Sequence, residues 1–301
     1  MIKYYTDEQI EKLISVEDAF EWVSALIKTK KDSILPAKTS LKMDGHIFYN
    51  YMPCILPQYN VAGVKVVNRY PNNSPSLKSN IMIYDLTNGD IKAVMDANYI
   101  TSLRTGAVAA HSMLLFAKND YKTIALVGLG NVTKMAFKIF MAKCQKRQLE
   151  IKLYRYKDHA ERFIQEFGYC KNCEFVICNT YEELMMDSDI IVSGITYAEK
   201  DFCDEKLYKH GCTIVPIHTL GFQNCDLTFD KVFGDDYDHI KGFKYFDKFK
   251  SFNEVCDVVN GKVKGRENDS DRILVYNIGI AIHDIYFANN FYNQINNIKQ
   301  D

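Results

Sequence analysis

The segment from Thr123 to Thr133, Thr-Ile-Ala-Leu-Val-Gly-Leu-Gly-Asn-Val-Thr, constrains the fold of this chain more than any other. Its apolar first half predicts a buried parallel strand, and Gly128 and Gly130 then predict a tight turn. Apolar residues at helical spacing begin directly afterwards, at Met135. This order is the context of a dinucleotide-binding fingerprint, in which turn glycines let the backbone approach a pyrophosphate at a helix N-terminus.

The fingerprint is incomplete, because Thr133 occupies the position of the third glycine. A plain strand–turn–helix unit without a ligand would show the same pattern, so the turn alone leaves both readings open. The surrounding chain favours the nucleotide reading, because strand and helix patterns alternate from residue 123 to residue 234. Such alternation predicts βαβ units and a parallel sheet.

The first third of the chain has a different pattern. A helix is predicted after Ser15, and an Asn88-Gly89 hairpin joins the last two of the strand-forming runs at 47–52, 62–67, 81–86 and 91–96. Long helices are predicted from residue 100 and over 272–291. The predicted fold class is therefore α/β, with a Rossmann-type parallel-sheet domain at 113–271 and an N-terminal α+β domain made of 1–112 and 272–301.

Net charge and the distribution of apolar residues give expectations about the partners and the compartment of this protein. The net charge of −1 gives no reason to expect a nucleic acid or an anionic membrane surface as partner. No apolar run is long enough to span a bilayer, and the polar first residues are unlike a signal peptide, so we expect a cytoplasmic protein that does not enter a membrane.

The nine cysteines have no disulfide-like rhythm. Cys170 and Cys173 form a C-x-x-C pair, but a zinc site would need further ligands at suitable spacing, and a thioredoxin-like pair would lead a helix of a βαβ unit. Here the pair precedes a strand-like run, so we expect free cysteines and no metal.

Seven short motifs occur in order along nearly the whole chain. They are Pro36-x-Lys38, Gly63-Val64-Lys65, Lys92-Ala93-Val94-Met95-Asp96, Ile100-Thr101-x-Leu103-Arg104-Thr105-Gly106-Ala107, Val127-Gly128-x-Gly130, Gly261-x-x-x-Gly265-Arg266 and Tyr276-Asn277-x-Gly279-x-Ala281-Ile282-x-Asp284. Together they resemble the ornithine cyclodeaminase/μ-crystallin family. The Thr-x-Leu-Arg-Thr block and the last motif are the most specific.

The resemblance implies an NAD(P)-dependent oxidoreductase that acts on the C–N bond of a small amino or imino acid, as amino-acid dehydrogenases and ketimine reductases do. It also implies a homodimer, with substrate binding and dimerisation in 1–112 and 272–301 and cofactor binding in 113–271. Two alternatives stay open: a cyclodeaminase-like lyase that releases ammonia, and an NADP(H)-dependent binding protein with little turnover, as in μ-crystallin.

The resemblance places three cations, Lys38, Lys65 and Arg104, around the substrate carboxylate. The planar fork of Arg104 suits bidentate binding, whereas the two lysines act as point charges. From the residues alone, Lys65 among valines either points to solvent or is buried with an anionic partner, and Arg104 could equally form a structural ion pair.

The resemblance also assigns cofactor contacts, to Thr105, Gly128, Gly130, Asn131 and Val132. The second strand of the Rossmann pattern ends without an acid for a ribose 2′-hydroxyl and carries Arg155 instead, at a position where NADPH-binding members have an arginine. NADP(H) is therefore favoured and NAD(H) is the alternative. If Arg155 does not contact a cofactor, it is an ordinary solvent-exposed arginine.

The proton-transferring residue is the point at which this chain departs from the family. Counted from Gly221, the family aspartate is replaced by Gln223, which cannot exchange a proton. Lys65, His218 and Asp226 are the remaining candidates for this role, since histidine titrates near neutral pH. A hydrogen bond at the end of a strand would equally account for His218, and capping of a helical turn would account for Asp226.

Overall fold

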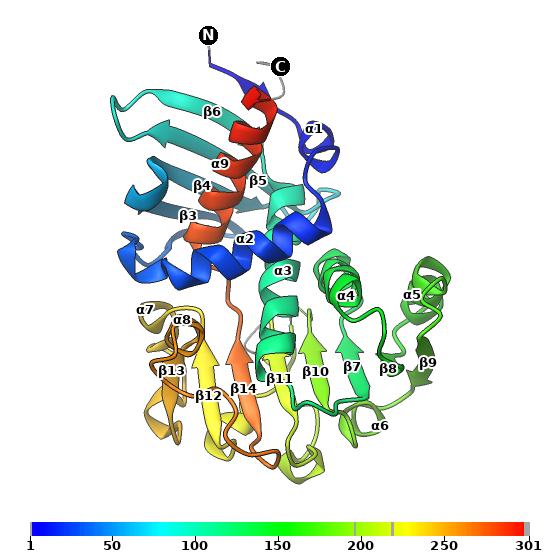
Figure 1. Ribbon diagram of the computed structural model, residues 1–301. Helices are drawn as coiled ribbons and strands as arrows, with labels where there is room; N and C mark the ends of the chain where they lie inside the picture. The colour runs from blue at the N-terminus through cyan, green and yellow to red at the C-terminus, as the bar shows by residue number, and fades with distance from the viewer. Residues whose placement is uncertain (1, 196, 218–219, 298–301) are drawn as a thin grey trace. The chain divides into compact units, whose positions relative to one another are not determined.

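The computed structural model describes residues 2–195, 197–217 and 220–297. The chain divides into two compact units, which are described separately (Figure 1). Unit 1 contains Met1–Arg104 and Gly279–Asp301, and unit 2 contains Thr105–Ile278. The predicted boundaries at 112 and 272 differ from these, because the first falls inside a helix and the second before a strand that belongs to unit 2.

Unit 1 is built on a six-stranded sheet with the order β1-β6-β5-β4-β3-β2. Its strands are β1 (Tyr4–Tyr5), β2 (Thr39–Met43), β3 (Ile47–Leu56), β4 (Val61–Arg69), β5 (Leu77–Asp85) and β6 (Ile91–Asp96), and its helical elements are α1 (Asp7–Glu11), α2 (Val16–Lys28), η1 (Lys30–Asp32), η2 (Pro57–Tyr59), the start of α3 (Asn98–Phe116) and α9 (Ala281–Asn297). Strands β2 to β6 are antiparallel neighbours. The expected helix and hairpin are confirmed: Ser15 caps α2 with a capping box, and Gly89 has a φ of 79° in the turn between β5 and β6.

Alternation along the strands gives this sheet two different faces. One row, Met52, Lys65, Ile81 and Met95, runs directly across β3 to β6 and is buried on the side that α9 covers. The next row, Pro53, Val64, Met82 and Val94, points to the opposite side and is only half-buried, although it is entirely apolar. We call this second row the open sheet face.

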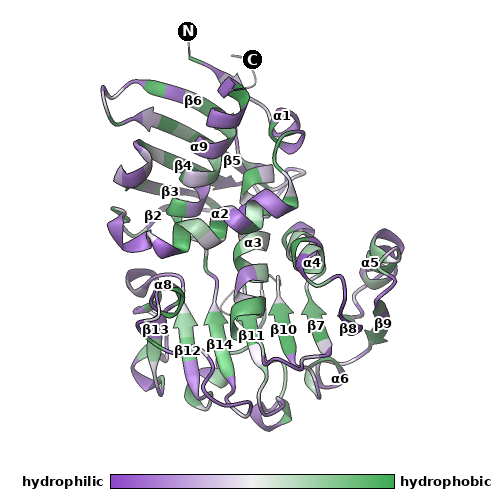
Figure 2. Cartoon of the chain, viewed as in Figure 1, coloured by the Kyte–Doolittle hydropathy of each residue, from purple (hydrophilic) through white to green (hydrophobic). Residues whose placement is uncertain are grey.

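Unit 2 is an eight-stranded parallel sheet with the order β13-β12-β14-β11-β10-β7-β8-β9. Its elements are the rest of α3, β7 (Thr123–Val127), α4 (Asn131–Lys143), β8 (Leu149–Tyr154), α5 (His159–Phe167), β9 (Cys173–Cys178), α6 (Tyr181–Met185), β10 (Ile190–Ser193), η3 (Glu205–Leu207), β11 (Thr213–Pro216), η4 (Cys225–Leu227), β12 (Lys231–Gly234), α7 (Tyr237–Ile240), η5 (Phe246–Lys248), β13 (Phe252–Glu254), α8 (Val255–Val259) and β14 (Ile273–Tyr276). The apolar colour of the central strands in Figure 2 matches their burial on both faces. The α/β class and the Rossmann-type sheet predicted from the sequence are confirmed.

The strand order reverses between β7 and β10, which lie side by side although β8 and β9 separate them in the chain. In open parallel sheets this switch point leaves a crevice at the carboxyl ends of the strands, where ligands bind. The glycine turn follows β7 and therefore lies at this point of unit 2.

The helix predicted over 272–291 is wrong in its first half. Ile273–Tyr276 forms β14, between β11 and β12, and the helix α9 begins only at Ala281. A short apolar run such as Ile-Leu-Val-Tyr fits a buried strand and a buried helix equally well by periodicity. Gly279, with a φ of 77°, separates the two elements.

Candidate functional site

The glycine turn of unit 2 has the backbone that its sequence requires. Gly128 has a φ of 75°, and a Cβ there would lie 2.6 Å from the amide nitrogen of Ile195, so only glycine fits. The hydroxyl of Thr133 donates to the carbonyl oxygen of Gly128 at 2.7 Å. The residue that makes the fingerprint incomplete therefore holds the turn in place from inside the first turn of α4.

Gly130 is the N-cap of α4, and a Cβ on it would meet no atom within 4 Å. It borders a cavity of about 390 Å³, which is lined by Val127, Gly128, Leu129, Gly130, Tyr154, Tyr156, His159, Tyr181, Gly194, Ile195 and Tyr197. These residues end or follow β7, β8 and β10, or begin α5 and α6. The cavity thus combines the N-terminus of a 13-residue helix with open space above a glycine, the two features that an anionic pyrophosphate needs.

Aromatic side chains form another wall of this cavity. Tyr154 and Tyr181 are stacked, with ring centroids 4.1 Å apart and an interplanar angle of 13°. Tyr156 and His159 lie beside them in the lining. The sequence motifs did not single out these four residues, although Tyr154 ends the second Rossmann strand and Tyr156 and His159 follow it, which is where the ribose of a bound dinucleotide is recognised.

Arg155 lies between two of these lining residues in the chain but has partners of its own. Its Nε donates to Oδ1 of Asn179 at 2.9 Å, and its Nη1 donates to Oε1 of Glu161 at 2.7 Å. Of the other predicted contacts, Asn131 and Val132 open α4, and Thr105 is buried in α3. Arg155 is thus a half-exposed cation held beside the cavity by an acid from α5.

Unit 1 brings two of the three predicted cations onto one carboxylate. Nζ of Lys65, on β4, donates to Oδ1 of Asp284 at 2.8 Å, and Nε of Arg104 donates to the same oxygen at 2.9 Å. The side chains of Lys65, Arg104 and Asp284 are 1%, 6% and 0% exposed. The solvent-exposed alternative for Lys65 is therefore excluded, and the ion-pair alternative for Arg104 describes part of its environment.

The third cation, Lys38, precedes β2 and has an exposed side chain. Partial desolvation of its amino group and the positive charge of Arg104 lower the pKa of Lys38. Gly279 explains how the guanidinium fits, because a Cβ at this position would lie 2.6 Å from Nη1 of Arg104. The sequence motif around Gly279 thus makes room for Arg104.

Burial and charge act in opposite directions within this group. Burial lowers the pKa of Lys65 to about 8, the Asp284 carboxylate opposes that effect, and Arg104 adds to it. The pKa of Asp284 is below its ordinary value even though burial raises it, since Arg104 and Lys65 both stabilise the carboxylate. Two buried cations therefore share one buried anion. Within the described residues, neither Lys65 nor Arg104 has an ion pair with any other carboxylate.

The proton-transfer candidates in unit 2 are placed only in part. His218 lies outside the described residues. Asp226 is buried in η4 and accepts a hydrogen bond from the hydroxyl of Tyr276, the last residue of β14. Asp226 lies within η4, whose N-cap is Asn224 and which has no side-chain cap hydrogen bond, so the capping alternative is wrong. Burial raises the pKa of Asp226 to about 7 against the effect of the Tyr276 hydroxyl.

The family model that describes the ornithine cyclodeaminase/mu-crystallin family matches residues 4–299. The chain belongs to this family. Its relatives include nodulation efficiency protein NfeD of Rhizobium meliloti, 28% identical over 83% of this chain and 81% of the relative. A Δ1-pyrroline-2-carboxylate reductase of Bacillus cereus is 25% identical over 97% of this chain and 96% of the relative.

Solved structures show the same fold. An archaeal alanine dehydrogenase dimer with bound NAD superimposes with a TM-score of 0.86 and 22% identity, over 99% of this chain and 97% of that one. The likeness therefore covers both units of this member of the ornithine cyclodeaminase/mu-crystallin family.

Two motifs that carry the family resemblance have structural roles in unit 2. Arg266 donates to the carbonyl oxygens of Phe116 and Asp271 and to the hydroxyl of Thr213, so it ties the end of α3 to β11. Asn277 donates to Ser112 and Asp235. Neither residue is a predicted site residue, and both satisfy buried polar groups that would otherwise be costly.

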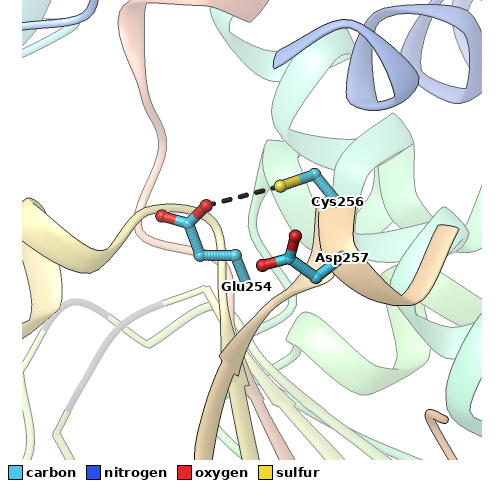
Figure 3. Close-up of side chains that lie close together, drawn as sticks. All are labelled: Glu254, Cys256 and Asp257. Atoms are coloured by element: carbon cyan, nitrogen blue, oxygen red, sulfur yellow. Dashed lines mark hydrogen bonds between the residues drawn. The ribbon is translucent and has the colours of Figure 1, made fainter. Parts of the chain in front are cut away.

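All nine cysteines are free, as expected. Glu254, Cys256 and Asp257 place three possible ligand atoms within 4.8 Å of one another, as Figure 3 shows. The Cys256 thiol, however, donates to the Glu254 carboxylate, which also accepts the amide of Tyr237 at 2.8 Å. These bonds join β13, α7 and α8, so the cluster has a structural explanation.

Proposed function

We propose that this protein is a nicotinamide-dependent oxidoreductase that acts on the C–N bond of a small amino or imino acid. The observation that carries the proposal is the buried excess of positive charge around Asp284. The two positive charges of Lys65 and Arg104 exceed the single negative charge of the carboxylate that they share. An unbalanced buried charge is costly, and a substrate carboxylate would balance it.

The three cations would bind the substrate carboxylate in different ways. Nη1 of Arg104 is buried and has no hydrogen-bond partner among the described residues, so this donor is available to a carboxylate. Lys38 and Lys65 contribute charge without a fixed fork. Lys65 would also hold or release a proton at Nζ, since its pKa of about 8 lies close to the working pH of a cytoplasmic enzyme.

The glycine-turn cavity of unit 2 fits the cofactor. Gly128 and Gly130 would admit the pyrophosphate, the first turn of α4 would donate amides from Asn131 and Val132, and the tyrosine faces would cover an apolar ring. When bound, the cofactor supplies or accepts a hydride. Thr105 is proposed as a further contact from α3.

NADP(H) is the favoured cofactor within this proposal and NAD(H) the alternative. The chain from 153 to 157 carries no acid for a ribose 2′-hydroxyl, and Arg155 provides a cation beside the cavity. A 2′-phosphate would compete with Glu161 for its guanidinium.

For proton transfer we propose His218 and Asp226 in addition to Lys65. The pKa of Asp226, about 7, suits exchange near neutral pH. Gln223 in place of the family aspartate weakens the lyase alternative more than reduction, because ring closure with loss of ammonia depends more strongly on that acid.

We further propose a cytoplasmic homodimer. The open sheet face offers a continuous apolar row, Pro53, Val64, Met82 and Val94, that a second copy could cover. Nine free cysteines fit a reducing compartment. No helix within the described residues has the length and apolar character needed to cross a membrane.

The deciding experiment is an absorbance screen of the reduced nicotinamide. The purified protein is offered L-amino acids with NAD⁺ or NADP⁺, and cyclic imino acids or keto acids with amines and NADH or NADPH. Turnover that depends on a carboxylate substrate is expected. Release of ammonia from ornithine without net change of cofactor would favour the lyase, and saturable binding of NADPH without any turnover would favour the binding protein.

A further inference from the structure

Among the described residues, Asp284 is the carboxylate that pairs with Lys65 and Arg104 in unit 1. It was not among the residues predicted to bind substrate or transfer a proton. We propose that Asp284 is a positioning residue: it fixes Nζ of Lys65 and the guanidinium of Arg104 for substrate and keeps Lys65 protonated at neutral pH. This inference rests on the proposed function for the meaning of "substrate", but its effect on Lys65 can be measured without turnover.

The geometry gives Asp284 control over both cations. A single oxygen, Oδ1, accepts Lys65 at 2.8 Å and Arg104 at 2.9 Å, so the two donors are held at one point. Asp284 itself is 0% exposed. A carboxylate with no exposed surface acts on an entering ligand through its neighbours.

The helix that carries Asp284 favours its ionised form. Asp284 lies in the first turn of α9, a 17-residue helix, where the positive end of the helix dipole stabilises an anion. The helix also packs on β3, β4 and β5, the strands around Lys65. The position of the carboxylate is therefore set by the packing of the whole helix on the sheet.

The charged and titratable groups around Lys65 come from three elements and from the segment before β2. Asp284 lies on α9, Arg104 on α3, and Cys54 on β3, where burial keeps the thiol neutral by raising its pKa. Lys38, in the segment before β2, lies close enough to Arg104 for the guanidinium charge to lower the pKa of Lys38. Burial and Arg104 lower the pKa of Lys65, and only Asp284 raises it. Without the carboxylate, both remaining effects favour the neutral amine.

The test is Asp284→Asn, which keeps the shape and one acceptor oxygen but removes the charge. Pyrrole-2-carboxylate is the probe, titrated calorimetrically into the NADH- or NADPH-loaded protein between pH 5.5 and 9.5. In the wild type we expect affinity to fall only above about pH 8. In the variant the fall should begin at least about one pH unit lower, with at least about tenfold weaker binding at pH 7.5.

The second measurement is the free energy of unfolding against pH, which needs no ligand. The pKa of Lys65 in the folded protein lies below its value of about 10.4 in the unfolded chain. Between these two pH values the unfolded chain holds the Lys65 proton and the folded chain does not. Stability therefore rises with pH in this window. The window should open at a lower pH in Asp284→Asn and disappear in Lys65→Met, a variant that keeps the test decisive if Asp284→Asn fails to fold.

Asp189→Asn is the matched control. Asp189 is also a buried carboxylate shared by two cations, Lys209 at 2.7 Å and Lys118 at 3.3 Å, but it lies in unit 2. This variant should lose stability without moving the pH profile of probe binding, because Asp189 pairs with Lys118 and Lys209 and not with Lys65. An Asp284→Asn profile that coincides with the wild type, or a rise in stability that persists in Lys65→Met, would overturn the inference. A wild type that does not bind the probe would contradict the proposed function, while the unfolding profiles would still decide the role of Asp284.

Discussion

Lys65 shows how a single side chain can be ambiguous in sequence and unambiguous in structure. It follows Val64 and precedes Val66 in a strand whose alternate residues point to opposite faces. The register with β3 and β5 places it in the buried row beneath α9, where Asp284 meets it. Its charge is thus retained in the interior by a partner 219 positions away in the chain.

Arg104→Lys should reduce kcat/KM for the carboxylate substrate by about tenfold to a hundredfold. Lysine keeps the positive charge but lacks the planar fork in which Nε bonds Asp284 while Nη1, a separate atom, would meet the substrate carboxylate, and a charge-assisted hydrogen bond is worth about 1.5–3 kcal/mol. Arg162→Lys is the control, because Arg162 forms an exposed i,i+4 pair with Asp158 that contributes little. Wild-type kinetics in Arg104→Lys would refute the carboxylate role.

Arg155→Gln tests cofactor choice. If Arg155 leaves Glu161 to bind a 2′-phosphate, its loss should weaken NADPH binding by about tenfold to a hundredfold and NADH binding much less. Dissociation constants from the fluorescence of the reduced cofactors give the ratio directly. Arg162→Gln, on the same helix as Glu161, should leave both constants unchanged. An equal loss of affinity for NADPH and NADH would mean that Arg155 does not bind the 2′-phosphate.

At the scale of elements, local signals were sufficient where a turn or a helix cap is marked by residues close together in the chain. Gly128 and Gly130 define the turn between β7 and α4, and the capping box at Ser15 defines the start of α2. Local signals were insufficient for β14, because four apolar residues carry no period. Its neighbours β11 and β12 make it a strand.

Gly130→Trp should abolish cofactor binding while leaving the fold intact. Gly130 has an ordinary φ of −85° and open space around its Cβ position, so the indole can be accommodated but would occupy the glycine-turn cavity. Gly242→Trp is the matched control, since a Cβ there also meets no atom within 4 Å and Gly242 does not line the cavity. Unaltered NADPH affinity together with an unaltered circular dichroism spectrum in Gly130→Trp would refute the assignment.

At the scale of the whole molecule, the two units differ in how completely their apolar strand residues are buried. Those of the open sheet face in unit 1 are less buried than those of the central strands of unit 2. In unit 2 the central strands β7, β10 and β11 are buried almost throughout. In unit 1 the row through Val64 and Met82 stays half-buried. This asymmetry is the physical reason to expect self-association through unit 1.

If the proposed dimer forms through the open sheet face, Val64→Glu should convert it to monomers, because the charge would lie in the centre of an apolar contact. Sedimentation velocity at micromolar concentration measures the change. Tyr169→Glu provides the control, since Tyr169 is a 65% exposed apolar residue of unit 2 and its substitution should leave the assembly as it is. A Val64→Glu dimer as stable as the wild type would place the interface elsewhere.

The sequence by itself determined the order and type of most elements and the glycine turn, and the family motifs in it named Lys65 and Arg104, the two cations that meet at Asp284. These features depend on period, on turn glycines and on short motifs, all of which act within a few residues. The tertiary structure alone decided that Lys65 is buried, that Asp284 holds it, that Tyr154 and Tyr181 line the cavity and that β14 is a strand. Each of these depends on strand register or helix packing between distant segments, and no local pattern encodes which segments meet.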